Sequence, residues 1–376
     1  MNLKLILKRL ENSILNLLDK TFKKMRFIFA ISIFLFFNKL NADINLIPIL
    51  ENLNKPWSVT LINEKKLLIT EKSGNILLFD RSEKIIKKIN HNLNVLEHGQ
   101  GGLLDILFKN KKVYVSYAEN RGNGKSSTSV AVAKFNEDNL KFVNIFQAQP
   151  PINSGYHFGS RLVLKKDKLY ISAGERGGGI IAQDPSQHPG SIIRINIDGS
   201  IPSDNPKFLN RKEWLPEIYQ IGIRNVQGMA LSPFDGEIYM TNHGPRGGDW
   251  FGTVNKGGNY GWDKLYWGGT KYSGLKGGPK WLPGFDKPIK YYVPSIATSA
   301  MLIYKGNEFE EWNGKALISA LKDKSIRIVT FKKNKFLNEE IIFKDKIGRI
   351  RDIKLDHKGR VLVLTDQGVL WLLSKI

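Results

Sequence analysis

The sequence predicts an all-β fold, a six-bladed β-propeller with long functional loops, and three observations support this prediction. A two-strand phrase recurs, in which an apolar strand, a polar turn and a second apolar strand ending in Thr or Ala precede a loop; its clear copies are residues 58–70, 161–173, 229–241 and 353–365. No segment of any length after residue 43 has helical periodicity. The 35 Gly, 12 Tyr, 20 Phe and 8 Trp among 376 residues are typical of many short strands joined by turns.

The remaining strands follow from the spacing of these copies. In three copies a glycine and a third apolar strand come next, at residues 74–79, 190–197 and 368–373. Weaker phrases fill the two long gaps, residues 103–117 with 130–135 and residues 300–304 with 315–331. Six blades of about 55 residues each then account for the rest of the chain, because each four-stranded sheet buries its faces against its neighbours. A pair of β-sandwiches is the structural alternative, but it does not explain the repeated phrase.

Residues 1–42 are expected to be an N-terminal leader and signal peptide, and residues 43–376 to be the propeller domain. Met25 and Arg26 open a basic segment, an apolar run covers residues 27–37, and Ala42 is a small residue at a cleavage point. This run is shorter than the ~20 apolar residues that span a bilayer. We therefore expect export, to the periplasm or beyond, with translation starting at Met25. The alternative is an uncleaved segment that tethers the protein to a membrane.

The charge of the chain is strongly basic, with 57 Lys and Arg against 35 Asp and Glu and a formal net charge of +22. After residue 42 the basic residues are scattered singly or in short pairs, unlike the basic block of a nucleic-acid-binding tail. We therefore expect no nucleic-acid partner. The absence of Cys excludes disulfides, thiolate metal sites, cysteine nucleophiles and covalently attached haem.

Several of the expected loops combine glycines with polar side chains, so that the backbone can approach a ligand closely. These loops contain Gln100 in residues 97–104, His157 in residues 153–161, Glu175 in residues 174–179, and Arg224, Asn225 and Gln227 in residues 222–228. A single His or acid in a loop is more often a surface residue than a catalytic one. None of these positions therefore indicates a function by itself.

Later loops add a tight turn and several cations. The carbonyls of Gly244 and Pro245 could bind a hard cation such as calcium, although an ordinary turn has the same sequence. Lys322 follows an expected strand, and Arg349 and Arg351 share a face if they lie on one strand. Two guanidinium groups on one face suit a ligand with several carboxylates, while solvated arginines are the alternative.

Together and in this order, the segments resemble the soluble pyrroloquinoline-quinone (PQQ)-dependent sugar dehydrogenases, most closely the periplasmic aldose sugar dehydrogenase branch. The resemblance covers about residues 50–374. It rests on the motifs His-Gly-Gln-Gly-Gly-Leu-Leu, Gly-Ile-Arg-Asn-Val-Gln-Gly-Met, His-Gly-Pro-Arg-Gly-Gly-Asp, Gly-Gly-Asn-Tyr-Gly-Trp, Ala-Leu-Lys-Asp and Arg-Ile-Arg-Asp. The fold of that family is a six-bladed propeller, in agreement with the phrase count.

The resemblance implies that aldose sugars are oxidised to lactones at the anomeric carbon, with PQQ as the redox cofactor and a calcium ion that polarises its quinone. His157 resembles the general base that takes the proton of the anomeric hydroxyl, and the carbonyls of Gly244 and Pro245 resemble the calcium ligands. The implied cofactor-binding residues are Gln100, Glu175, Arg224, Asn225, Gln227, Lys322, Arg349 and Arg351. Electrons would leave through a separate acceptor, a quinone or a redox protein.

Two other functions compete with this one. A calcium-dependent lactonase on a propeller needs acidic metal ligands in the central channel, where this chain offers Arg, Lys and Gln. A non-catalytic propeller that binds glycans or proteins leaves the cationic positions unexplained. Residues 270–282 carry no family signal, so the sequence predicts no sugar preference.

Overall fold

The computed structural model describes residues 44–207 and 213–375. The chain divides into two compact units, of which one is Leu46–Ser374 and the other is Met1–Asn45 with Lys375–Ile376. The expected leader, signal peptide and start at Met25 lie outside the described residues. Of the helices in the described part, none is long and apolar enough to cross a membrane.

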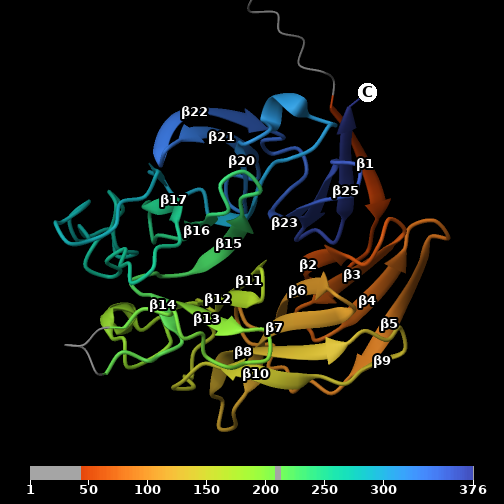
Figure 1. The fold of residues 1–376 in the computed structure, drawn as a ribbon. Coiled ribbons are helices and arrows are strands. Elements are labelled where there is room, and N and C mark those ends of the chain that lie inside the picture. The colour runs from red at the N-terminus through yellow and green to blue at the C-terminus, as the bar shows by residue number, and fades with distance from the viewer. Residues whose placement is uncertain (1–43, 208–212, 376) are drawn as a thin grey trace, which may run out of the picture. The chain divides into compact units, whose positions relative to one another are not determined.

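The first three blades of the propeller follow one another along the chain (Figure 1). The first contains β2 (Pro56–Leu61), β3 (Lys66–Glu71), β4 (Ile76–Asp80) and β5 (Ile85–His91), with the short β9 (Asn139–Leu140) added at its edge. The second contains β6 (Leu103–Lys109), β7 (Lys112–Asn120), β8 (Ser126–Lys134) and β10 (Val143–Gln147). The third contains β11 (Gly159–Lys165), β12 (Lys168–Ala173), β13 (Ser191–Asn196) and β14 (Ile218–Gln220).

Three further blades complete the described propeller. The fourth contains β15 (Val226–Leu231), β16 (Ile238–Asn242), β17 (Asp249–Thr253) and β18 (Lys290–Tyr292). The fifth contains β19 (Thr298–Ile303), β20 (Ala316–Ala320), β21 (Ile326–Lys332) and β22 (Lys335–Ile342). The sixth contains β23 (Ile350–Leu355), β24 (Val361–Thr365), β25 (Leu370–Lys375) and β1 (Ile44–Leu50). Two short 3-10 helices, Gly179–Gln183 and Glu310–Trp312, are the helices of the described residues.

The predicted fold class is confirmed. Each clear two-strand phrase corresponds to the first two strands of a blade, and the weaker phrases fall in the second and fifth blades. The strands expected after glycines are β4, β13 and β25. One strand was not predicted: β1 pairs with β25 and supplies the outer strand of the sixth blade.

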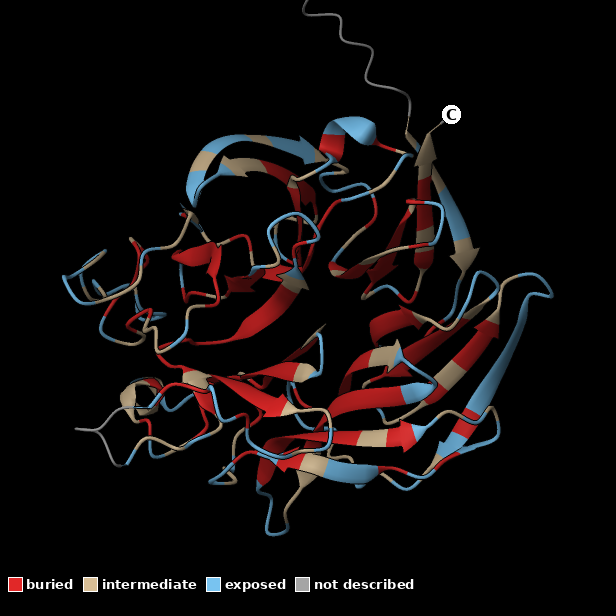
Figure 2. Cartoon of the chain, viewed as in Figure 1, coloured by how far each residue is buried: buried red, intermediate tan, exposed pale blue. Residues whose placement is uncertain are grey.

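The core lies between the blades. Leu68 and Ile76 of the first blade pack in one cluster with Val115 of the second, and Ile69 of the first packs in another cluster with Leu364 of the sixth. All five side chains are fully buried, and burial of each contributes about 1.5–3 kcal/mol. The outer strands, such as β5 and β22, are largely exposed (Figure 2). Each blade is therefore held mainly by its neighbours.

The first strand of every blade lies innermost, and these six strands contact one another in the order β2, β6, β11, β15, β19, β23 and back to β2. Each of the six has an irregular register within its first few residues, as in a β-bulge. Bulges turn side chains away from the regular alternation and are common beside active sites. Three residues inside these irregularities are Trp57, Gln227 and Arg351.

A buried ionic network joins the inner strands. Arg161 Nη1 donates to Asp105 Oδ1 at 2.9 Å and to Asp352 Oδ1 at 3.0 Å. Ser58 Oγ lies 2.6 Å from the same Asp105 oxygen. Arg161 Nε also donates to the carbonyl of Gln227 at 2.8 Å. Five of the six blades are thus tied together at the centre of the propeller.

Replacing Arg161 with leucine is expected to destabilise the protein by about 3 kcal/mol, because two buried carboxylates would lose their common cation. Urea unfolding followed by tryptophan fluorescence measures this change. Lys87→Ala is the control, because Lys87 forms an exposed ion pair with Asp138 and such pairs contribute little to stability. Equal unfolding midpoints for the two variants would show that the buried network does not stabilise the fold.

Candidate active site

The strand order explains why the polar loops meet. In an antiparallel pair, the start of the first strand and the end of the second lie at the same edge. His157 precedes β11 and Glu175 follows β12, while Arg224 precedes β15 and Pro245 follows β16. His157 and Pro245, 88 positions apart in the sequence (245 − 157), therefore reach one edge of the propeller ring. Two adjoining cavities open among these loops.

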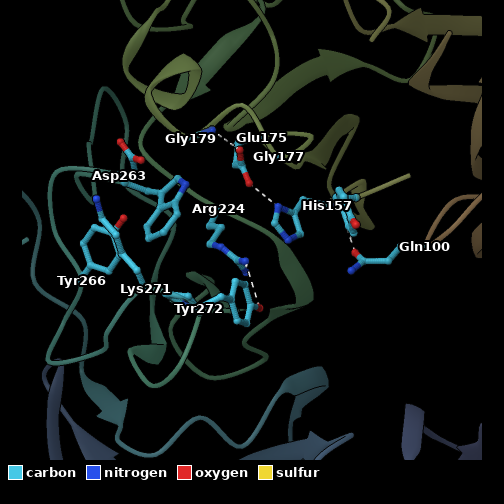
Figure 3. Close-up of a pocket in the computed structure, with 13 residues that line it drawn as sticks. Gln100, His157, Glu175, Gly177, Gly179, Arg224, Asp263, Tyr266, Lys271 and Tyr272 are labelled. Atoms are coloured by element: carbon cyan, nitrogen blue, oxygen red, sulfur yellow. Dashed lines mark hydrogen bonds and ion pairs between the residues drawn. The ribbon is translucent and has the colours of Figure 1, made fainter. Parts of the chain in front are cut away.

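We name the larger cavity the aromatic compartment (Figure 3); it has a volume of about 450 Å³. Its lining comprises Gln100, Tyr156, His157, Glu175, Gly177, Gly179, Arg224, Pro245, Trp262, Asp263, Tyr266, Lys271 and Tyr272. The smaller cavity, the basic compartment, has a volume of about 220 Å³. Its lining comprises Trp57, Lys72, Gly99, Gln100, His157, Arg224, Asn225, Gln227, His243, Tyr272, Ala297, Leu321, Arg349 and Arg351. His157 belongs to both linings.

His157 is held by contacts to its ring and to its backbone. Its Nδ1 contacts Glu175 Oε1, and its backbone N–H donates to Gln100 Oε1 at 3.0 Å (Figure 3). The other oxygen of Glu175 accepts a hydrogen bond from the backbone N–H of Gly179 at 2.5 Å. Position 174 must be glycine, because a Cβ there would lie 2.0 Å from the carbonyl oxygen of His157. The imidazole is therefore fixed in orientation.

The environment favours a neutral imidazole beside a charged carboxylate. Burial lowers the pKa of His157, and the hydrogen bond to Glu175 opposes this effect without reversing it. Burial alone would raise the pKa of Glu175, but the hydrogen bonds from His157 and from the backbone of Gly179, together with the charge of Arg224, outweigh it and leave that pKa lowered. Nδ1 then carries the proton donated to Glu175. Nε2 of the ring keeps a lone pair that can accept a proton.

The basic compartment gathers four cations: Lys72, Arg224, Arg349 and Arg351. Arg351 donates to both oxygens of Asp366, at 2.8 and 3.0 Å, and to Gln227 Oε1 at 3.0 Å. Arg349 donates to the same carboxylate at 2.9 Å, so the two arginines do share a face.

The lowered pKa values of two other side chains reflect both burial and the positive charge of this compartment. Lys72 is half-buried, and burial together with the charge of Arg351 lowers its pKa. Burial lowers the pKa of His243 to about 3, so this ring is neutral. Its buried Nε2 has no hydrogen-bond partner among the described residues. A ligand with several carboxylates would meet a pocket that is already positively charged.

Arg224 lies between the two compartments. Its guanidinium donates to the carbonyls of His243 and Gly244, at 3.3 and 3.2 Å, and to the hydroxyl of Tyr272 at 3.4 Å. It also lies 5.3 Å from the ring centroid of Trp262, within the range of a cation–π contact. The next residue, Asn225, accepts a hydrogen bond from the backbone N–H of Gly159 at 3.0 Å and so joins the third and fourth blades.

The Gly244-Pro245 turn is held by a buried acid. The backbone N–H of Gly244 donates to Asp249 Oδ1 at 2.7 Å. Pro245 lines the aromatic compartment, and the carbonyl of Gly244 faces Arg224. The described residues contain no group of three or more His, Cys, Asp or Glu side chains that could hold a metal ion. Backbone oxygens are thus the donors that this turn offers to a cation.

The structure brings most of the sequence-predicted residues together. The residues that line at least one compartment are Gln100, His157, Glu175, Arg224, Asn225, Gln227, Pro245, Arg349 and Arg351. Gly244 lies beside them through its contact with Arg224. Lys322 is exposed and lines neither compartment, although the preceding residue, Leu321, does.

Sequence reasoning missed a second set of lining residues: Trp57, Lys72, Tyr156, His243, Trp262, Asp263, Tyr266, Lys271 and Tyr272. Two signals could have found some of them. Lys72 directly follows the second strand of the first phrase, and Trp262 ends the Gly-Gly-Asn-Tyr-Gly-Trp motif. The remainder of the 254–289 loop has no such signal.

Comparisons with known proteins agree with this geometry. The chain is 33% identical to the aldose sugar dehydrogenase YliI of Escherichia coli over 339 residues, which cover 87% of this chain and 91% of that protein. It is 28% identical to quinoprotein glucose dehydrogenase B of Acinetobacter calcoaceticus over 313 residues, covering 73% of this chain and 63% of that protein.

Solved structures give the same result. The soluble aldose sugar dehydrogenase of Escherichia coli, in its apo form, superposes with a TM-score of 0.83 and 33% identity over 88% of this chain and 99% of that chain. The PQQ-bound aldose sugar dehydrogenase of Streptomyces coelicolor shares the fold, with a TM-score of 0.73 and 20% identity over 89% of this chain and 98% of that one. Since the model of the glucose/sorbosone dehydrogenase family also matches residues 53–372, the chain belongs to that family.

Proposed function

We propose that this protein is a PQQ-dependent dehydrogenase that oxidises aldose sugars at the anomeric carbon to lactones. One observation carries the proposal: His157 lies where a compartment lined by cations adjoins a compartment lined by aromatic rings. An anionic cofactor and a polyhydroxyl substrate would each find a suitable lining, with a proton acceptor between them. The quinoprotein relative and the aldose sugar dehydrogenase relative support both assignments.

The basic compartment fits PQQ by charge. PQQ carries three carboxylates, and Lys72, Arg224, Arg349 and Arg351 supply four cations, of which two share one carboxylate partner. Gln100, Asn225 and Gln227 would orient the ligand by hydrogen bonds. We also propose Lys322 as a PQQ-binding residue, although it would reach the cofactor only from the edge of the basic compartment. When bound, PQQ supplies a quinone that accepts the hydride released from the sugar.

The Gly244-Pro245 turn is our proposed calcium site. Its donors are backbone oxygens, the type of ligand that calcium prefers. In the present structure the Gly244 carbonyl accepts a hydrogen bond from Arg224, so metal binding would replace that contact. A bound calcium ion would act as a Lewis acid on the quinone oxygen.

The residues of this chain would handle the proton and the position of the sugar. Nε2 of His157 accepts the proton of the anomeric hydroxyl, and the Glu175 carboxylate stabilises the imidazolium that results. The rings of Tyr156, Trp262 and Tyr266 would pack against the apolar faces of the sugar and exclude water. Electrons then leave through a separate acceptor, a quinone or a redox protein, and we propose that the protein works after export, in the periplasm or beyond.

The lactonase alternative meets a structural difficulty. It needs carboxylates free to bind calcium in the central channel, and Asp105 and Asp352 on the inner strands are both bound to Arg161.

The pH dependence of sugar oxidation tests the role of His157. We expect the rate to rise with pH along an acid limb whose midpoint lies below 6.5, the usual pKa of histidine, because burial lowers the pKa of His157 and only the neutral ring accepts a proton. In Glu175→Gln the limb should move to lower pH, because a carboxylate that raises this pKa is lost. The plateau rate should fall by about 10-fold or more. A limb that moves to higher pH would contradict this assignment.

Reconstitution of the purified protein tests the proposed function as a whole. PQQ and calcium are added to the apoprotein, its melting temperature is recorded, and dye reduction is measured with a panel of aldoses. We expect a PQQ-dependent rise in melting temperature and sugar-dependent dye reduction that a calcium chelator lowers. The proposal would be refuted if PQQ caused no thermal shift and no aldose in the panel caused dye reduction.

A further inference from the structure

The aromatic compartment contains two polar side chains that form no hydrogen bond with another described residue, on consecutive residues of the loop after β17. Asp263 lines the compartment, and apart from its own backbone N–H no described residue donates a hydrogen bond to its carboxylate. Trp262 lines it as well, and its indole N–H is buried without a hydrogen-bond partner in the described part of the chain. The unpaired buried indole N–H is costly to the protein unless a ligand satisfies it, and the partly exposed carboxylate of Asp263 is free to accept hydrogen bonds from that ligand.

The position of Asp263 is defined by its neighbours. It lies on the side of the compartment away from Gln100, with Tyr266 and Lys271 in the same region (Figure 3). One carboxylate oxygen would lie only 2.7 Å from a Cβ at position 179, so glycine there leaves room for the acid. Asp263 therefore lies beside Gly179, on the side of the compartment away from Gln100.

We propose that Asp263 and Trp262 form a subsite for the hydroxyl groups of a neutral sugar that are farthest from the reacting carbon. This inference rests on the proposed function and names the substrate feature that the same site recognises. A hydroxyl both donates and accepts hydrogen bonds, so one hydroxyl, or a neighbouring pair, satisfies the carboxylate and the indole N–H together. Among the ring hydroxyls of a pyranose with its anomeric carbon beside His157, these are the hydroxyls of C3 and C4.

The subsite has a consequence for sugar selection. A carboxylate accepts hydrogen bonds from hydroxyls, and each such bond to a charged group is stronger than one between neutral groups. A sugar without the contacted hydroxyl leaves Asp263 and Trp262 unpaired in the complex, and sites of this kind discriminate strongly against such analogues. The loop after β17, rather than the motif residues around His157, would then set the sugar preference.

The test compares Asp263→Ala, Asp263→Asn and Trp262→Phe with wild type. Asp167→Asn is the control, because Asp167 is an exposed acid that lines neither compartment. Binding of glucose and of its 2-, 3- and 4-deoxy forms to the purified protein is measured by saturation-transfer NMR, which needs no turnover. kcat/KM for the same four sugars is measured with PQQ and calcium, and PQQ binding is followed by the thermal shift.

Asp263→Ala should lower kcat/KM for glucose by about 10- to 100-fold, mainly through KM, with a weaker NMR signal. Asp263→Asn and Trp262→Phe should lower it by about 5- to 10-fold, while Asp167→Asn and the PQQ thermal shift stay unchanged. For the 3- or 4-deoxy sugar that lacks the contacted hydroxyl, the loss in Asp263→Ala should shrink below about 3-fold, whereas 2-deoxyglucose should behave like glucose.

Two results would overturn the subsite: the same loss for all four sugars, or NMR binding of glucose that is unaffected in Asp263→Ala or absent in wild type. A different result would refute the proposed function without refuting the subsite. If wild type shows no PQQ shift and no dye reduction but binds glucose through Asp263, the subsite stands and the redox assignment does not.

Discussion

Replacing His157 with alanine is expected to lower kcat for sugar oxidation by about 1,000- to 10,000-fold, while PQQ binding stays within about 3-fold of wild type. The loss follows from removing the one described side chain that is shared by both compartments and has a free ring nitrogen to take a proton. General base catalysis contributes up to about 10,000-fold in enzymes. Stopped-flow reduction under saturating PQQ measures kcat for the chemical step, and the thermal shift measures cofactor binding.

A matched control separates this effect from the loss of any histidine. His357 is exposed and lines neither compartment, so His357→Ala should keep full activity. If kcat of His157→Ala stays within about 10-fold of the wild-type value, another group removes the proton.

Replacing Arg351 with alanine is expected to weaken PQQ binding by about 100- to 1,000-fold and to leave kcat at saturating PQQ within about 10-fold of wild type. The side chain is only 13% exposed, so its charge acts in a poorly solvated pocket. Its loss also removes the main cation that neutralises the partly buried Asp366, so the carboxylate would then repel an anionic ligand. Truncating one partner of a buried charge pair costs about 2–5 kcal/mol.

Arg349 provides a graded comparison for this prediction. It donates to the same carboxylate, but its side chain is 45% exposed, so Arg349→Ala should weaken PQQ binding by only about 10-fold. PQQ affinity is measured by titrating each variant and following the quenching of tryptophan fluorescence. Equal affinities for the two variants, or a loss of kcat without a loss of affinity in Arg351→Ala, would contradict the assigned role.

The blades could be predicted because their pattern is local. Each phrase places two antiparallel strands within about 13 residues, and this spacing is visible without knowledge of the fold. β1 could not be found in this way, since its partner β25 lies at the other end of the sequence and no turn connects them. The bulges were hidden for a related reason: Trp57, Gln227 and Arg351 leave the alternating pattern that sequence reasoning follows.

The candidate site was predictable where motifs mark it and not elsewhere. His157 and Arg224 lie in short motifs next to strands, so their positions and the residues that surround them in the site could be predicted. Asp263 and Tyr266 follow the last motif of the long loop between β17 and β18, which is held by contacts between distant parts of the loop, such as the 2.7 Å hydrogen bond from the backbone N–H of Asn259 to Asp286. Such contacts produce no periodic pattern of residues in the sequence.

The pairing of β1 with β25 also determines when the sixth blade can form during synthesis of the protein. A ribosome makes β1 first and β25 last, so the sixth blade can form only after more than 300 residues have been synthesised between them. Contacts so distant in sequence slow folding because the loop between them must close first. If the protein is exported, as we propose, a ring that cannot close early would leave the chain able to thread through a translocation pore until β25 has passed.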